Sequence, residues 1–184
     1  MPRKSITELT AQADATLPDN ATQLITPAAV RNMIKDFLNT MRPAYAAATI
    51  TTPVVKALTT TDSALALETT ISNSPADFTI NLPTGLVTQA AHGTVRVNFT
   101  VDVQYPNNSI TTFTLYADGV ATPWAISNTS TSATDLQSYA LSAINYSSAL
   151  TPTYQIRVKS NGSNSVTLSN GALVVENVPV NVFT

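Results

Sequence analysis

The chain has 184 residues, and about a third of them are small uncharged polar side chains: 30 Thr, 16 Ser and 15 Asn. Only 11% of the residues are charged, the net charge is −2, there is no Cys, and His92 is the single histidine. These counts exclude disulfide frameworks, cysteine nucleophiles, Cys-based zinc sites and any site that needs two histidines. With 43% apolar residues the chain is expected to fold rather than stay disordered.

The N-terminal residues differ in charge from the rest of the chain. Residues 1–56 contain six basic and four acidic residues, whereas residues 57–184 contain three basic and seven acidic ones. The basic residues are too scattered to neutralise a run of phosphates, so we do not expect nucleic acid as a partner. No apolar run follows the basic start and none approaches 18 residues, so we expect no signal peptide and no membrane insertion.

Two helices are expected near the N-terminus. A capping-box pattern from Ser5 to Glu8 predicts a short helix over residues 6–15. A second helix is predicted to begin after Thr26, with Pro27 in its first turn, and to end before Pro43. Its apolar residues follow the spacing of one helical stripe: Val30, Met33, Ile34, Phe37, Leu38 and Met41.

This apolar stripe must pack on something, because a helix of this length is marginal alone in water. In one interpretation it covers the core of the chain's own β domain. In the other it contacts copies of itself around a symmetry axis, or docks on a larger assembly. Residues 44–53 are interpreted as an extended connector, which predicts a helical attachment or oligomerisation region over 1–53 and a β domain over 54–184.

From about residue 54 the apolar residues recur with a period of two. The clearest strand is predicted over 94–104, where apolar and polar residues alternate strictly. The other strands are expected at 54–58, 65–71, 78–82, 110–117, 122–126, 136–146, 153–159, 165–169 and 172–176. The pattern of 136–146 also fits a helix, and its neighbours favour a strand. This number of short strands predicts a mostly β protein, an antiparallel β sandwich or jelly roll.

Turn signals separate these strands. Pro106-Asn107-Asn108, Asp118-Gly119 and Asn161-Gly162 are expected to be turns, and Asn170-Gly171 is the sharpest signal for a type I′ hairpin. A last strand, from Val178 to Phe183, contains Pro179 and is therefore expected at a sheet edge or at a bulge.

The sequence contains little equipment for catalysis. A hydrolase would need His92 as its base, but no G-x-S-x-G elbow occurs. The carboxylates of the β domain are spread singly, so we expect no resident metal or cofactor, although a calcium site assembled across loops stays open. Trp124 is expected in the core of the sandwich more readily than in a sugar site. We therefore expect a protein that is not an enzyme, and we keep Trp124 and Tyr146 as candidate ligand residues.

One segment resembles a known group of proteins. Leu17-Pro18-Asp19-Asn20, the helix with V-R-N-M-I-K-D-F-L after I-T-P, and Pro43-Ala44-Tyr45 occur in the order found in the N-terminal module of tailed-bacteriophage virion proteins. That group includes head-fibre, capsid-decoration and tail-fibre proteins. The resemblance covers about 30 residues and implies a homotrimer, fixed to the major capsid protein or another virion protein by its N-terminal part and found in the virion after assembly in the host cytoplasm.

The remainder resembles the trimeric tumour-necrosis-factor-like jelly roll in its pattern. The resemblance rests on the strand at 94–104, the hairpin at 115–119 and the expected hairpin at 166–175. It implies that one sheet face of each subunit packs at a three-fold axis while the loops form an exposed tip. Our leading hypothesis is a phage structural protein whose helical stripe makes the oligomer or virion contact. The alternative is a tail-fibre or baseplate protein that binds a receptor or a host-surface glycan.

Overall fold

A computed structural model of the chain describes residues 6–16, 27–41, 44–72, 75–91, 93–105, 109–132 and 135–178. It divides into two compact units, residues 1–43 and residues 44–184. The first unit contains two helices, α1 (Ile6–Thr16) and α2 (Pro27–Met41). The strands of the second unit are β1 (Tyr45–Ile50), β2 (Val54–Leu58), β3 (Ser63–Ala64), β4 (Thr69–Ser72), β5 (Phe78–Asn81), β6 (Leu86–Gln89), β7 (Gly93–Gln104), β8 (Ile110–Ala117), β9 (Val120–Thr129), β10 (Leu136–Ser147), β11 (Thr153–Ser160) and β12 (Asn164–Asn177).

The two predicted helices are confirmed. The helix expected over 6–15 ends at Thr16, and the second begins at Pro27, whose missing N–H costs nothing in a first turn. The helices contact each other, and the Gln12 amide donates a hydrogen bond of 3.1 Å to the Asp36 carboxylate. The N-terminal unit is therefore a pair of helices that pack on each other, in which α1 covers part of α2.

The segment interpreted as an extended connector contains the first strand of the sheet domain. Ala46, Ala48 and Ile50 of β1 are buried, and the division between the two units falls after Pro43 rather than after Pro53. The interpretation missed this strand because its inward residues are mostly alanines, whose small apolar contrast with Thr hides the period of two. The sheet domain of the structure is therefore longer than the predicted one, by one strand at its N-terminal end.

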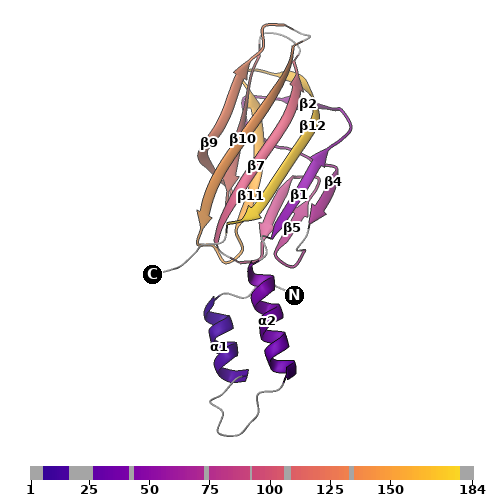
Figure 1. Cartoon of the computed structure of the whole chain (residues 1–184). Coiled ribbons are helices and arrows are strands. Elements are labelled where there is room, and N and C mark those ends of the chain that lie inside the picture. Colours follow the sequence, from indigo (N-terminus) through magenta and orange to yellow (C-terminus); the bar gives the residue numbers. More distant parts are fainter. Residues whose placement is uncertain are drawn as a thin grey trace. The chain divides into compact units, whose positions relative to one another are not determined.

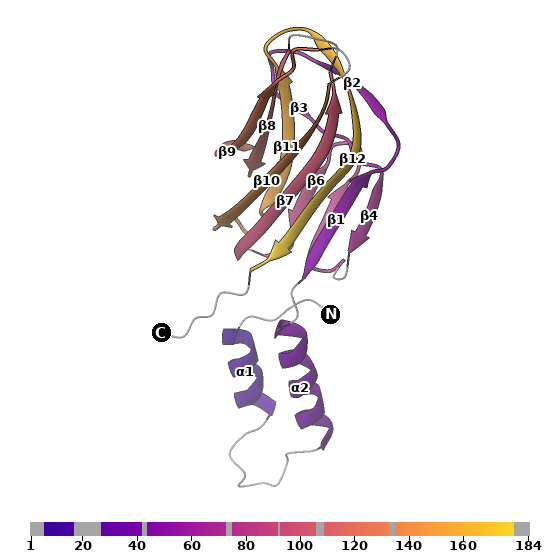
Figure 2. The same cartoon turned by 45° about the horizontal axis from the view of Figure 1, so that its top comes forward.

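The strands form two antiparallel sheets, as predicted. The first, which we call sheet A, has the order β10-β7-β12-β1-β4, and β2 also pairs with β12. The second, sheet B, has the order β5-β6-β11-β8-β9, and β3 also pairs with β11. Figure 1 shows sheet A towards the viewer, and Figure 2 shows more of sheet B behind it. The start of β1 and the end of β12 lie side by side, because Tyr45 pairs with Glu176.

The core fills the space between the sheets. In β7 every second residue from Val95 to Val103 is buried, which is the alternation that the sequence predicts. At the centre Phe113 of sheet B lies 5.3 Å from Phe99 and 4.9 Å from Tyr139 between ring centroids, both from sheet A. Burial of such side chains supplies about 1.5–3 kcal/mol each and ties the two sheets together.

The Asp118-Gly119 turn is confirmed, because both residues have the positive φ (52° and 78°) of a type I′ hairpin and they join β8 to β9. The hairpin expected at Asn170-Gly171 is wrong. The chain runs straight on as β12, with a register shift between Ser169 and Ala172 and a positive φ only at Asn170. A Cβ on Gly171 would lie 2.9 Å from Ile50 Cδ1, so this glycine allows close contact with β1 instead of making a turn.

Most other strands agree with the prediction to within a few residues. Residues 136–146, which also fit a helix, form β10, which pairs with β7 along its whole length and buries Tyr139, Leu141 and Ala143. The strand expected at 65–71 begins at Thr69 and follows the short β3. The turn at 106–108, the last strand after Val178 and His92 lie outside the described residues.

Candidate functional site

The apolar stripe of α2 has a half-buried part and an exposed part. Val30 and Met33 are half-buried, whereas Ile34, Phe37 and Leu38 are 50%, 54% and 55% exposed. The side chain of Met41 is not among the described ones. The exposed part of the stripe is narrower than the sequence predicts, because α1 packs against the side of α2 that carries Asp36. No sequence signal points to this contact, which pairs two polar side chains.

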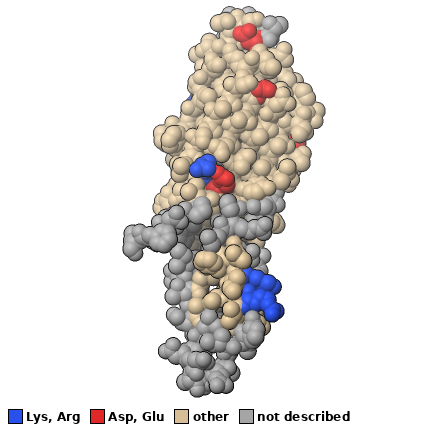
Figure 3. All heavy atoms as spheres, viewed as in Figure 1, with Lys and Arg blue, Asp and Glu red and all other residues tan. Residues whose placement is uncertain are grey.

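The outer face of sheet A carries exposed apolar residues and few charged side chains. Its apolar residues occupy outward positions of β1, β2, β4, β10 and β12, whereas the outward positions of β7, which lies between β10 and β12, are polar. The apolar residues are Ala47, Val55, Ile71, Leu136, Ala140, Ile144, Tyr146, Ala172 and Val174. Ile71, Ile144 and Tyr146 are each more than half exposed. In Figure 3, which is viewed from this side, only isolated charged side chains interrupt the uncharged surface.

The polar side chains of this face bind one another. Ser142 donates to Asn98 at 2.7 Å, and Arg96 pairs with Glu176 at 2.9 Å. Ser138 and Asn170 both donate to the Asp102 carboxylate, at 2.5 and 2.9 Å. These hydrogen bonds, that from Ser138 first, hold the pKa of Asp102 below its usual value. These polar groups therefore already have partners before anything covers the face.

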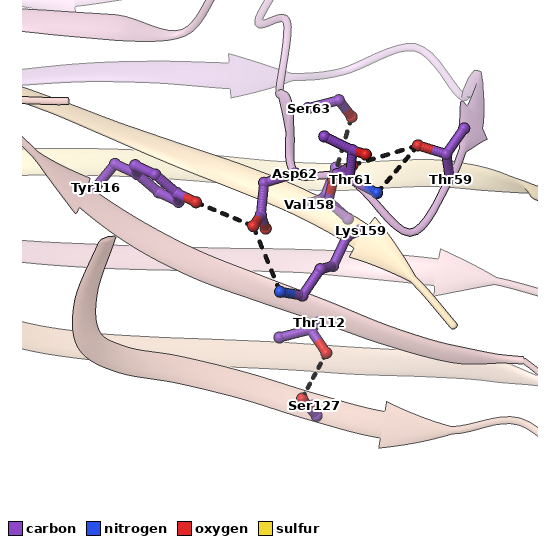
Figure 4. A network of polar contacts seen from close by, with 9 residues as sticks. All are labelled: Thr59, Thr61, Asp62, Ser63, Thr112, Tyr116, Ser127, Val158 and Lys159. Atoms are coloured by element: carbon purple, nitrogen blue, oxygen red, sulfur yellow. Dashed lines mark hydrogen bonds and ion pairs between the residues drawn. The ribbon is translucent and has the colours of Figure 1, made fainter. Parts of the chain in front are cut away.

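The outer face of sheet B carries a different set of groups. Asp62, which precedes β3, accepts hydrogen bonds from the Tyr116 hydroxyl at 2.9 Å and from the Lys159 ammonium at 3.4 Å (Figure 4). The pKa of Tyr116 is raised, first by burial and then by the neighbouring Asp62, while Arg157 and Lys159 act in the opposite direction. Tyr116 therefore stays a protonated donor, and the contacts join the β2–β3 connection to β8 and β11.

Arg157 lies over the ring of Tyr116, with the guanidinium carbon 4.2 Å from the ring centroid. Its Nε donates to the Gln155 side-chain oxygen at 2.7 Å, and the Gln155 amide donates to the Thr84 carbonyl at 2.8 Å. These contacts fix the guanidinium on the outer face of sheet B. Sequence reasoning missed this group, because Tyr116 and Asp62 are distant in the sequence from Arg157 and Lys159.

The other residues singled out in the sequence do not form one site. Trp124 lies on β9 of sheet B and is 44% exposed, so it is not the core residue that was expected. Tyr146 lies on β10, at an outward position of sheet A. Over the described ranges, no three His, Asp or Glu side chains lie close enough to hold a metal ion, and no helix is long and apolar enough to cross a membrane.

Comparison with known proteins informs the fold. The sequence matches no protein-family model, and no curated protein is similar to it in sequence. Among solved structures, the chain is similar to the Eiger TNF of S. frugiperda, with 15% identity and a TM-score of 0.54 over 74% of this chain and 94% of that one. It is also similar to murine APRIL, with 6% identity and a TM-score of 0.52 over 74% and 100% of the two chains. The second unit is therefore a jelly roll like that of TNF.

Proposed function

We propose that the chain is a structural subunit of a tailed-bacteriophage particle. In this proposal three copies form a homotrimer through the outer face of sheet A, and the N-terminal helices attach the trimer to the capsid or to another virion protein. The TNF-like jelly roll and the resemblance of the N-terminal segment to phage virion proteins both support it. The observation that carries it is the outer face of sheet A, where exposed apolar residues lie beside the Arg96–Glu176 and Ser142–Asn98 pairs.

The centre of this face consists of small side chains. One row across the sheet is formed by Ala140, Thr100, Ala172 and Thr49, which are neighbours in adjacent strands. Small side chains leave the sheet surface flat and let another backbone approach closely. Apolar surface that leaves water on association contributes about 25 cal/mol per Å². This row therefore suits close packing against a second copy.

The paired polar groups lower the cost of covering the face. Burying a polar group without a hydrogen bond costs about 1–3 kcal/mol, and burying an unpaired charge costs more. The Arg96–Glu176 and Ser142–Asn98 pairs keep their partners when water is removed. The outer face of sheet A thus carries the features of a surface that is buried in an assembly. On the outer face of sheet B, Arg157 and Lys159 would stay exposed to water.

The helices supply the second contact. Ile34, Phe37 and Leu38 form an exposed apolar strip on α2, and Arg31 and Lys35 are exposed on the same helix. Only three residues separate the end of α2 from the start of β1. In a trimer this short connection holds three helix pairs at high effective concentration, so a weak contact with each of several capsid copies adds up. The protein would then be found in the virion, without any enzymatic activity.

The mass of the protein in solution tests the assembly. Light scattering after size exclusion is expected to give about 58 kDa, three times the 19.4 kDa of one chain. Ile144→Asp places a charge on the outer face of sheet A and is expected to give monomers with an unchanged β-sheet circular dichroism spectrum. Val120→Asp makes the same kind of change at an exposed position of β9 and is expected to leave the trimer intact.

A wild-type protein that stays monomeric at millimolar concentration would overturn the trimer. Attachment is tested separately with purified phage heads or tails from which this subunit is missing. Wild-type protein is expected to bind them, and Phe37→Asp is expected to lose binding while its mass in solution stays that of a trimer. Equal binding of the Phe37→Asp protein would contradict the role of α2.

A further inference from the structure

We propose that the outer face of sheet B binds the carboxylate of an acidic sugar, with Arg157 as the group that holds the carboxylate. The site comprises Arg157 and Lys159 on β11, Tyr116 on β8, and Asp62 before β3. It lies on the face opposite to the one proposed for self-association, so it does not depend on the trimer.

Arg157 differs from Arg96 and Lys159 in having no ion-pair partner within the described part of the chain, and unlike the half-buried Lys56 it lies over an aromatic ring on the outer face of sheet B. Arg96 pairs with Glu176, Lys159 contacts Asp62, and the Lys56 ammonium donates to the Ala64 carbonyl at 2.7 Å. Within the described part of the chain, the hydrogen bond of Arg157 is the one from Nε to the neutral amide of Gln155. A cation without a counter-ion on an otherwise acidic domain favours an external anion.

The guanidinium is held in place before any ligand arrives. The Tyr116 ring supports one of its planes at 4.2 Å, and Gln155, itself buried and bound to the Thr84 carbonyl, occupies its Nε. No described residue accepts a hydrogen bond from its two Nη nitrogens, which form the fork that binds carboxylates with two parallel bonds. Because the side chain is already ordered, binding loses little conformational entropy.

The charges around Arg157 favour a ligand with a single negative charge. Arg157, Lys159 and Asp62 together carry a charge of about +1, whereas residues 44–184 contain four basic and seven acidic residues. The Lys159–Asp62 contact is long, at 3.4 Å, and the lysine side chain is 41% exposed. Lys159 is therefore available to add to the local positive potential. A polyanion such as nucleic acid would be repelled by the net negative domain around this spot.

Hydroxyl side chains on the neighbouring strands lie near Arg157 and Lys159. They indicate which groups, besides a carboxylate, a ligand would have. Thr112 lies opposite Lys159 in the register of β8 and β11, and Thr114, which is buried, lies opposite Arg157. Thr112 in turn shares a hydrogen bond of 2.7 Å with Ser127 of β9. Hydroxyls donate and accept hydrogen bonds, so they complement the hydroxyls of a sugar. A carboxylate and several hydroxyls on one small molecule describe an acidic sugar.

The experiment compares two sugars that differ in the carboxylate alone. Methyl glucuronide and methyl glucoside are titrated against the full-length protein, with binding followed by saturation-transfer NMR. We expect methyl glucuronide to bind with a Kd of about 1 mM or weaker, as is ordinary for one small ligand on an open surface, and methyl glucoside to bind at least about tenfold more weakly. Equal signals from both sugars, or no binding of either up to about 50 mM, would overturn the proposal.

Variants locate the binding on the protein. Arg157→Gln is expected to weaken methyl glucuronide binding about tenfold or more, because it removes a charged, forked donor. Arg31→Gln removes the same charge from α2 and is expected to change nothing. Arg157→Lys keeps the charge but loses the fork and the ring contact, so it is expected to weaken binding several-fold and serves if Arg157→Gln fails to fold. Unchanged affinity in the Arg157 variants would overturn the site, whether or not the protein is a trimer.

Discussion

The two outer faces of the jelly roll differ in how their charges are satisfied. On sheet A, Arg96 and Glu176 form an ion pair, and the Asp102 carboxylate accepts two hydrogen bonds from the neutral side chains of Ser138 and Asn170. On sheet B, Arg157 is fixed on a tyrosine ring and has a neutral amide as its hydrogen-bond partner. A face that satisfies its own polar groups can lose water at little cost, whereas a face with an unneutralised cation favours contact with water or with an anion. The same fold thus presents one face suited to burial and one suited to exposure.

This contrast arises although the inward faces of the two sheets are alike. Each sheet contributes alternating apolar residues and buried tyrosines: Tyr105, which follows β7, and Tyr139 on β10 belong to sheet A, and Tyr154 on β11 belongs to sheet B. The inward residues of both sheets are thus of the same apolar and aromatic kind, and the two sheets differ in their outward residues. The following changes test this division.

Alkaline pH is expected to lower the free energy of unfolding more than any of the other changes, and to act through residues of both sheets. Burial raises the pKa of Tyr105 and of Tyr154 to about 12, and Asp118 adds to the effect on Tyr154. In the unfolded chain a tyrosine titrates near 10. The stability contributed by each neutral tyrosine is therefore complete below pH 10 and is lost as the pH rises through 12, on the order of 2 kcal/mol per tyrosine.

Urea unfolding at a series of pH values checks this expectation. Tyr105→Phe and Tyr154→Phe should each flatten the fall in the free energy of unfolding between pH 10 and 12. Measurements at pH 8 show the effect of the missing hydroxyl alone, which for Tyr154 includes its 3.3 Å hydrogen bond to Gln89. If only one of the two variants flattened the dependence of the free energy of unfolding on pH, the buried Tyr105 of sheet A and Tyr154 of sheet B would not be equivalent.

Gly171→Val is expected to lower the stability of the fold by a smaller amount, because it changes the packing of sheet A alone. The first atom of the new side chain would lie 2.9–3.1 Å from the Ile50 side chain, so β12 and β1 would have to separate. Overpacking of this kind costs about 1–3 kcal/mol. Gly119→Ala in the β8–β9 turn is a useful contrast, since nothing lies near its Cβ and only its positive φ of 78° opposes the change. Thermal unfolding of both variants measures the difference, and an unchanged melting temperature for Gly171→Val would contradict the packing argument.

The smallest expected effect is on self-association, and it comes from removing one hydroxyl group from each outer face. Ser138→Ala removes the principal hydrogen bond to Asp102, so the pKa of Asp102 should rise towards its ordinary value and trimers should dissociate at a higher concentration. Thr112→Val removes the matching bond to Ser127 on sheet B and should leave association unchanged. Sedimentation at micromolar concentration distinguishes them. Equal weakening by both variants would show that the two faces are not as different as their polar contacts suggest.

Much of the fold was predictable from local patterns. Strict alternation in residues 94–104 predicts a strand with one buried face, and the structure confirms it in β7. Asp118-Gly119 predicts a turn, and the structure forms it with the positive φ of a type I′ hairpin at both residues. The same reasoning failed at Asn170-Gly171, since a local dipeptide cannot distinguish a turn from a bulge in a strand that is paired with β7 and β1. The strand β1 was missed because alanine gives almost no hydrophobic contrast.

The sequence by itself determined the class of this protein: a low-charge, cysteine-free chain of alternating strands, preceded by two short helices, with little equipment for catalysis. These are properties of neighbouring residues, and periodicity reports them directly. Only the tertiary structure decided which side chains meet. Asp62 and Tyr116 are 54 positions apart, Asp62 and Lys159 are 97 apart, and both contacts exist because sheet pairing brings their strands together. The partners on sheet A, such as Ser142 and Asn98, depend in the same way on the register between β10 and β7. Register is fixed by the burial of whole strands, so the character of each outer face follows from the packing of the core.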